Sequence, residues 1–219
     1  MPSSQPQLLA RGPWDPSQIE VSWREDRFEA PAEVEARADA AVEALRERGS
    51  PCHDGLSARL AGYSVAGERL ELELQPTRWA LRLVEGDAQE SLTALCVVRD
   101  EQGRWLAGRR AAWLATWAGR WALGAGGAVD LGESPAHTLV RELDEEWRLE
   151  PQRVTVEALV SLPDGLAMVV GMALVSGGAE PVADHEHDEF AWWPAEIERW
   201  PAEADARLRR MAAFLAAGS

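Results

Sequence analysis

Lysine is absent from this chain of 219 residues, and all 22 basic side chains are arginine. The absence excludes mechanisms that depend on a lysine amine, including Schiff-base catalysis. Cysteine is scarce as well, because only Cys52 and Cys96 occur. Two cysteines in an intracellular chain are more often reduced packing residues than a disulfide, and we expect that state here.

Long apolar runs and positive charge are also lacking. No apolar run approaches the roughly 18 residues of a membrane span, and Met1 to Arg11 has no apolar region of the kind found in signal peptides. We therefore expect a soluble, cytoplasmic protein that does not bind membranes. The net charge of −15 argues against binding along a nucleic-acid polymer, which needs a basic stripe. A small phosphorylated substrate is compatible with this charge, because a bound metal ion reverses its sign locally.

The stretch around which the chain is organised runs from Gly126 to Leu149 and contains an expected helix. Ser134 suits the N-cap and Pro135 the first helical position, so the helix should begin there and end at about Trp147. Its packing face is predicted to consist of Ala136, Leu139, Val140, Leu143 and Trp147. The neighbouring face carries Arg141, Glu142, Glu145 and Glu146.

The three carboxylates of this helix are spaced so that they converge. Like charges three and four residues apart repel, and a hard divalent cation would turn the repulsion into attraction. A solvated acidic face is the alternative, and the helix alone favours it. The preceding residues change that balance, because Gly124, Gly126, Gly127 and Gly132 lie directly before Glu133. A glycine-rich loop at a helix N-terminus can offer N–H groups to phosphate and carbonyls to a metal, so loop and helix together predict a metal-diphosphate site.

These residues resemble the signature of the Nudix hydrolases, G-x5-E-x7-R-E-U-x-E-E-x-G-U, with U a bulky aliphatic residue. The matching positions are Gly127, Glu133, Arg141, Glu142, Leu143, Glu145, Glu146 and Leu149. One position departs, since Arg148 stands where the family has the glycine that ends the helix. An arginine held at positive φ there would cost about 1 kcal/mol. Similar flanks extend the resemblance over roughly Ser91 to Trp200.

The resemblance implies an α/β protein with a Nudix fold, in which a mixed β-sheet lies between helices. It implies a hydrolase that cleaves the pyrophosphate bond of a nucleoside diphosphate linked to another group. Mg2+ or Mn2+ would be held by Glu142, Glu145, Glu146 and the Gly127 carbonyl, while Arg141 would orient Glu133 or its neighbours. The family also implies a further carboxylate in the acidic segment before Trp193, with Glu186 preferred to Glu189. Glu142 and Glu186 both stay open as the general base.

The remaining chain is predicted to form a tail over 1–18, a small α+β module over 19–88 and the Nudix domain over 89–219. We expect a helix over Pro31 to Arg48, strands over 19–23, 57–63 and 69–74, a hairpin over 92–110 and a terminal helix over Pro201 to Ala217. The module resembles the leading part of sugar-nucleotide-cleaving Nudix enzymes. Packing, substrate selection and a homodimer contact are open alternatives for it. Arg109 and Arg110 end a strand, either as phosphate-binding residues with Gly126 and Gly127 or as a surface pair.

Two rival functions come from other classes. Isopentenyl diphosphate isomerases share the fold, but their chemistry needs a cysteine near the glycine loop, and none occurs from Val97 onward. A non-catalytic nucleotide-ligand sensor on a Nudix scaffold is the other rival. The intact set of Glu142, Glu145 and Glu146 argues against it, because binding alone would not require all three.

Overall fold

The computed structural model describes residues 5–50, 54–114 and 117–217. Its strands are β1 (Gln7–Trp14), β2 (Ile19–Trp23), β3 (Leu56–Ala66), β4 (Arg69–Arg78), β5 (Leu92–Asp100), β6 (Trp105–Arg110), β7 (Trp121–Leu123), β8 (Ala125–Ala128), β9 (Arg153–Ser161), β10 (Ala167–Val175) and β11 (His187–Trp193). The helices are α1 (Ala32–Glu47), α2 (Pro135–Trp147) and α3 (Ala206–Ala216), with short 3-10 helices η1 (Pro16–Gln18), η2 (Trp79–Leu83) and η3 (Ile197–Arg199).

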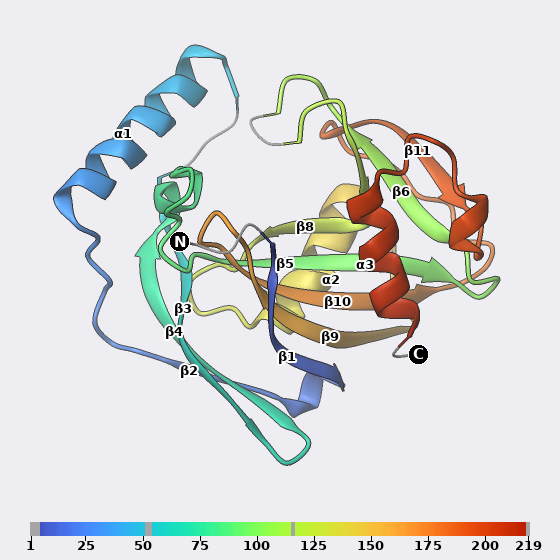
Figure 1. Ribbon diagram of the computed structural model, residues 1–219, viewed down its shortest axis with the longest axis horizontal. Helices are drawn as coiled ribbons and strands as arrows, with labels where there is room; N and C mark the ends of the chain where they lie inside the picture. The colour runs from blue at the N-terminus through green and yellow to red at the C-terminus, as the bar shows by residue number, and fades with distance from the viewer. Residues whose placement is uncertain (1–4, 51–53, 115–116, 218–219) are drawn as a thin grey trace.

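The larger sheet has eight strands in the order β1-β9-β10-β5-β6-β11, with β7 on β6 and β8 on β5. β10 and β5 run parallel while the other neighbours are antiparallel, so the sheet is mixed. α2 packs on one face and α3 on the other, and Figure 1 shows the sheet between them. Alternate residues of β5 point to opposite faces of the sheet. Cys96 and Val98 lie in the apolar core between the sheet and α2, and Val97 lies in the core between the sheet and α3. The expected mixed sheet between helices is therefore confirmed.

The two strands of the expected hairpin over 92–110 form, but they separate from each other along almost their whole length. β5 and β6 pair only at Arg99 and Trp105, and β8 pairs with the first half of β5 instead. The chain passes from β7 on β6 to β8 on β5 at Gly124, whose φ is +67°. A Cβ at Gly124 would overlap the carbonyl of Cys96, so only glycine fits this crossing. The separation of β5 from β6 makes room for β8, which contacts α2.

The N-terminal module shares a core with the larger sheet. Its three-stranded sheet, β2-β4-β3, buries Leu70, Leu72 and Leu74 in the same cluster as Leu139 and Trp147 of α2. Ala58 of β3 also donates a backbone hydrogen bond to Val129, at 2.8 Å, just before α2. A chain beginning near Asp87 would therefore expose a broad apolar surface, and point variants test the module better than truncation.

Residues 7–14 of the expected tail form strand β1, which pairs antiparallel with β9. The expectation of a tail over 1–18 is therefore corrected for residues 7–14, which are a strand of the larger sheet. Ala10 and Trp14 are buried by that pairing, although proline, serine and glutamine dominate the composition around them. The partner strand lies some 140 residues away in sequence, and local composition carries no information about it.

Two helices differ from their expected ends or faces. α3 begins at Ala206 rather than Pro201, because Asp205 is its N-cap and accepts hydrogen bonds from the N–H groups of Arg207 and Leu208. In α2 the expected packing residue Val140 is 40% exposed. The apolar face of α2 is narrower than the helical periodicity predicted, because Glu142 and Glu146 occupy the buried positions beside it.

Arg148 ends α2 in the left-handed conformation, with φ 52° and ψ 39°. Replacing it with glycine is expected to raise the melting temperature by a few degrees, because the positive φ costs arginine about 1 kcal/mol. The activity should be retained, since the side chain is 62% exposed and, among the described residues, has its one ion pair with Asp144, at 3.5 Å. Thermal melts and rates check both points. Asp144→Ala is the control for loss of the ion pair, and a lower melting temperature for Arg148→Gly would contradict the strain.

Candidate active site

The site is built on α2, which is held at its start by the predicted cap. The Ser134 side chain accepts a hydrogen bond from the N–H of His137, and Pro135 occupies the first turn. Leu139, Leu143 and Trp147 are fully buried against the sheet. This anchoring turns Glu142 and Glu146 inward, where they are 9% and 4% exposed, while Glu145 stays outside. The alternative of a solvated acidic face is therefore wrong for two of the three carboxylates.

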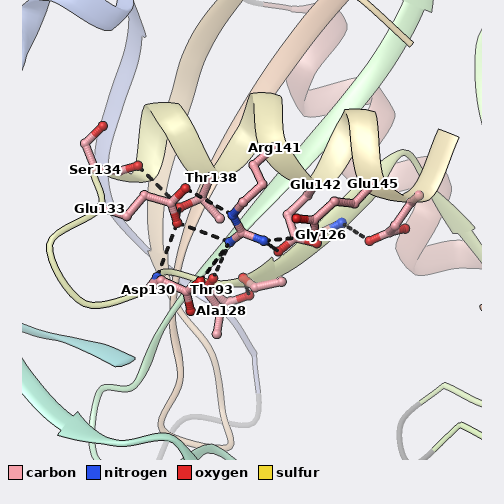
Figure 2. Close-up of polar contacts among 12 residues, drawn as sticks. Thr93, Gly126, Ala128, Asp130, Glu133, Ser134, Thr138, Arg141, Glu142 and Glu145 are labelled. Carbon is pink, nitrogen blue, oxygen red and sulfur yellow. Dashed lines mark hydrogen bonds and ion pairs between the residues drawn. The ribbon is translucent and has the colours of Figure 1, made fainter. Parts of the chain in front are cut away.

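Arg141 connects the carboxylates to one another. Figure 2 shows its guanidinium between Glu133 on one side and Glu142 and Glu145 on the other. Nε lies 3.1 Å from Glu133 Oε1, and Nη1 lies 2.7 Å from Glu142 Oε1 and 3.1 Å from Glu145 Oε2. Nη2 donates to the Ala128 carbonyl at 3.1 Å. The arginine thus fixes the distance between the loop carboxylate and the helix carboxylates.

Glu133 and Glu142 differ in charge behaviour although both touch Arg141. Burial raises the pKa of Glu133, but hydrogen bonds from Arg141, Thr138 and the Asp130 N–H outweigh it and leave the pKa below its usual value. Burial raises the pKa of Glu142, and the nearby Arg141 offsets only part of that rise. Glu133 is therefore an ionised anchor for Arg141, whereas Glu142 has a stronger affinity for a proton or another cation.

Glu146 is the most constrained of the carboxylates. Its Oε1 accepts the N–H of Gly126 at 2.8 Å, while Oε2 is buried without a hydrogen-bond partner among the described residues. Nε2 of His187 lies 3.7 Å from this oxygen, beyond hydrogen-bond distance. Burial raises the pKa of Glu146 well above its usual value, and the Gly126 hydrogen bond opposes this only partly. An unpaired buried oxygen of this kind requires a ligand or a proton.

Gly126 and Gly127 lie in strand β8, not in a phosphate-binding loop, which corrects that expectation. The N–H of Gly126 is already donated to Glu146. At Gly127 an added Cβ would overlap Oε1 of Glu142 and stand 2.5 Å from its Cδ. The Gly127 carbonyl accepts a 2.6 Å hydrogen bond from Thr93 Oγ1. Both glycines therefore allow the carboxylates of α2 to lie directly on the backbone of β8.

Arg109 and Arg110 form separate pairs across β6 and β11. Arg110 Nη2 lies 3.1 Å from Glu186 Oε2, and Arg109 Nε lies 3.4 Å from Glu189 Oε2. Arg110 is the strand partner of His187, whose Nε2 lies 3.7 Å from Glu146 Oε2, so this first pair lies beside the α2 carboxylates. Arg109 is 43% exposed in its pair and Arg110 only 18%. Of the two expected phosphate-binding arginines, Arg110 is the one beside the site.

The family model of the NUDIX domain matches residues 90–214. The chain belongs to the Nudix family. No curated protein matches it. Its class as a Nudix hydrolase enzyme is confirmed by the family match.

Solved structures with the Nudix fold resemble the chain over part of its length. A MutT protein from Methanosarcina mazei is 24% identical, with 58% of this chain and 91% of that chain covered and a TM-score of 0.43. The NUDIX domain of Shewanella oneidensis NrtR, complexed with ADP ribose, is 24% identical over 57% of this chain and 86% of its own, with a TM-score of 0.45. A Caenorhabditis elegans Ap4A hydrolase is 20% identical over 58% and 98%, with a TM-score of 0.43.

The sequence reasoning missed His187, which lies against the Nudix helix. Its side chain is 1% exposed, its ring centroid is 4.3 Å from that of Trp147, and Nδ1 lies 3.3 Å from Asp184 Oδ1. Burial lowers the pKa of His187, while Asp184 opposes the shift. The ring therefore faces Glu146 with the nitrogen that Asp184 does not engage. Proximity to Glu186 was the only sequence signal for it, and strand alternation did not show which histidine points inward.

The argument that no cysteine lies near the glycine segment is wrong in three dimensions. Cys96 is the direct partner of Ala125 in the pairing of β5 with β8. Its side chain is completely buried, and burial raises the pKa of the thiol to about 12. Such a thiol carries almost no thiolate near neutral pH, so it is a packing residue. Cys52, its expected counterpart as a reduced thiol, lies outside the described residues.

Among the described residues, no helix is long and apolar enough to cross a membrane.

Proposed function

We propose that this Nudix chain hydrolyses the pyrophosphate bond of a nucleoside diphosphate linked to another group, with Mg2+ or Mn2+ as cofactor. The observation that carries the proposal is the buried Oε2 of Glu146, which has no hydrogen-bond partner in the part of the chain that the structure describes. Glu146 lies one helical turn from Glu142. A buried carboxylate oxygen without a donor is costly unless it binds a cation or a proton. Carboxylate oxygens are the ligands that Mg2+ prefers.

The chain's own donors fit such a cation. Across the described residues, no three acidic, histidine or cysteine side chains already stand together as a metal site. Nη1 of Arg141 engages two of the carboxylates, those of Glu142 and Glu145. Release of Nη1 would free Glu142 and Glu145 to act with Glu146, while Arg141 keeps its contacts to Glu133 and Ala128. The Gly127 carbonyl, which accepts the hydrogen bond from the Thr93 hydroxyl, is proposed as a further oxygen donor to the cation.

When bound, a divalent cation would neutralise diphosphate charge and activate a water molecule. The chain's residues would do the rest of the work. Glu133 keeps Arg141 in place, and Arg141 orients the carboxylates. Glu142 and Glu186 are both proposed as proton acceptors: Glu142 because its pKa is raised by burial, and Glu186 because Arg110 holds it at the other side of the site. Arg110 is proposed to contact a substrate phosphate.

A nucleoside-diphosphate sugar is the proposed substrate class. This choice depends on the N-terminal module, whose strand β3 lies directly beside the segment before α2. Isolated bridges join Ser57 to Asp130 and Arg59 to Ser91. A module in that position is placed to contact the part of a substrate that extends beyond the diphosphate.

The test is a hydrolysis screen over nucleotide sugars, dinucleotides, triphosphates and coenzyme A derivatives, with Mg2+, with Mn2+ and with excess chelator. We expect turnover only with a divalent cation. Glu145→Gln should remove most of it without unfolding the protein, because an amide is a poorer metal ligand of the same shape. The matched control is Glu150→Gln, an exposed residue just after the helix. Full turnover by Glu145→Gln, or in chelator, would refute the metal assignment.

The non-catalytic sensor is the second candidate, and the same screen distinguishes it. A sensor would bind a nucleotide with no turnover under any metal condition. The intact set of Glu142, Glu145 and Glu146 favours the hydrolase, because binding alone would not require all three.

A further inference from the structure

Trp113 follows strand β6 and has no part in the site described above. Its indole ring is stacked on the imidazole of His185, with the ring centroids 5.4 Å apart and an interplanar angle of 9°. The residue nevertheless remains 39% exposed. An indole carries a large apolar surface, and the contact with His185 covers only part of it. The ring therefore keeps apolar surface available to a further planar group.

The backbone on both sides of Trp113 is fixed by hydrogen bonds. The N–H of Ala111 donates to the Glu186 carbonyl at 2.8 Å, and the N–H of Leu114 donates to the Ala111 carbonyl at 3.2 Å. Ser50, which follows α1, donates from Oγ to the Trp113 carbonyl at 3.1 Å. The N-terminal module and the segment before β11 thus hold Trp113 together. A ring fixed in this way costs little further ordering when it binds a ligand.

A chain of contacts joins Trp113 to the carboxylates of α2. Nδ1 of His185 lies 3.6 Å from Asp184 Oδ2, and Oδ1 of the same carboxylate lies 3.3 Å from Nδ1 of His187. Nε2 of His187 lies 3.7 Å from Glu146 Oε2. The N–H of Asp184 also donates to the Glu146 carbonyl at 2.9 Å. The stacked pair of Trp113 and His185 is therefore continuous with the proposed metal site.

The phosphate-binding candidate Arg110 lies next to the stacked pair as well. It stands three residues before Trp113, and its partner Glu186 directly follows His185. Arg110 Nη2 lies 3.1 Å from Glu186 Oε2. A substrate whose diphosphate meets Arg110 therefore has the Trp113 ring beside the rest of the molecule. Charged groups surround this ring, which suits a small polar ligand with a flat aromatic part better than the apolar core of a protein interface.

We propose that Trp113, supported by His185, stacks on the base of a nucleoside diphosphate substrate. This inference rests on the proposed diphosphate hydrolysis and identifies the part of the chain that contacts the nucleoside. Every base has a π face, so the contact favours nucleotides over diphosphates without a base and does not choose strongly among bases. Through Ser50, the N-terminal module takes part in placing the ring.

The test measures ligand affinities of the full chain in the presence of Mg2+, by titration calorimetry. The nucleotide ligands are the α,β-methylene analogues of ADP and UDP, whose diphosphate group resists hydrolysis. Methylenediphosphonate has the same two phosphorus groups and no base. We expect the parent to bind at least one nucleotide analogue more tightly than methylenediphosphonate.

Trp113→Ala should weaken binding of that nucleotide analogue about tenfold, within the range found for a base stacked on an aromatic side chain. Its affinity for methylenediphosphonate should stay within twofold of the parent's. Trp113→Leu keeps apolar bulk without a ring and should behave like the alanine variant. Trp113→Phe keeps a smaller ring and should fall between the alanine variant and the parent.

Trp117→Ala is the matched control, because Trp117 lies after the same strand, is 42% exposed and contacts Arg120 instead. It should match the parent for every ligand, and thermal melts monitor folding of all variants. Nucleotide affinity of Trp113→Ala and Trp113→Leu within twofold of the parent's would overturn the proposal. An equal loss for methylenediphosphonate would also overturn it, because the effect would then not concern the base.

The same measurements separate this proposal from the proposed function. If the parent binds neither the nucleotide analogues nor methylenediphosphonate, the diphosphate site itself is wrong, and the role of Trp113 is wrong with it. If the parent binds them but turns over nothing in the hydrolysis screen, only the hydrolase is refuted. The ratio of nucleotide to methylenediphosphonate affinity in the Trp113 variants then still decides whether the ring contacts the base.

Discussion

Glu146→Gln is expected to abolish turnover and, in the same protein, to raise the melting temperature measured in chelator. Activity should fall by at least about a hundredfold, equivalent to about 2.7 kcal/mol of transition-state stabilisation, because the buried ligand oxygen becomes an amide. Stability should rise because the amide keeps the hydrogen bond from Gly126 and carries no charge into the core. An amide NH2 can also donate toward Nε2 of His187, which stands 3.7 Å from the present oxygen.

The pH dependence gives the sign of this stability effect. Burial raises the folded-state pKa of Glu146, so folded and unfolded chains are both protonated only below the ordinary value of about 4.3. As pH rises from there to the raised folded pKa, the unfolded chain releases its proton while the folded chain keeps it. The contribution of Glu146 to stability is therefore lost over that interval, and glutamine loses nothing.

Melting curves in chelator from pH 4.5 to 8 measure the difference. The gap between Glu146→Gln and the parent should widen as pH rises, whereas the exposed control Glu150→Gln should follow the parent throughout. Added Mg2+ should raise the melting temperature of the parent and leave that of Glu146→Gln nearly unchanged, because a ligand stabilises only the folded state that binds it. If Glu146→Gln melts below the parent at pH 7 in chelator, the claim that the buried Glu146 charge destabilises the metal-free protein is wrong.

Gly127→Ala is expected to cost about a hundredfold in kcat/KM with little loss of secondary structure. The added Cβ would overlap Oε1 of Glu142, so the carboxylate must move by an ångström or more. A displacement of that size in a catalytic group costs on the order of a hundredfold. Gly127 is not among the described glycines with positive φ, so the substitution adds no left-handed strain of its own.

Gly178→Ala is the matched control, because nothing lies within 4 Å of its added Cβ. Rates and circular dichroism are measured for both variants. We expect the control to match the parent in rate and in spectrum. A Gly127→Ala enzyme with the parent's kcat/KM would show that Glu142 can occupy another position without loss, and its role as a ligand at this place would then be wrong.

The helix of the site could be derived from the sequence because its signals are local. The cap at Ser134, the proline after it and the 3.6-residue spacing of Leu139, Leu143 and Trp147 lie within a few turns of each other. The same holds for the apolar run of β5 and for the terminal amphipathic helix. The family signature is equally local, and with it the mixed sheet between helices could be predicted.

The spacing of the carboxylates in the sequence did not predict which of them are buried. The three glutamates look equivalent in the sequence, yet Glu142 and Glu146 are buried and Glu145 is exposed. The difference depends on β8, which comes under α2 only because β5 and β6 splay and Gly124 permits the crossing. The inference of a phosphate-binding loop failed for the same reason, since a strand and a loop of glycines have the same composition.

The sequence by itself therefore determined the family, the fold class and the helix that carries the carboxylates, because short-range periodicity, capping and a fixed motif spacing specify them. Tertiary structure alone decided which groups meet. It paired β1 with β9, put Cys96 opposite Ala125 and set His187 beside Glu146. Each of these contacts joins residues that are far apart in the chain, and their energies arise from desolvation and strand pairing, which no local pattern encodes.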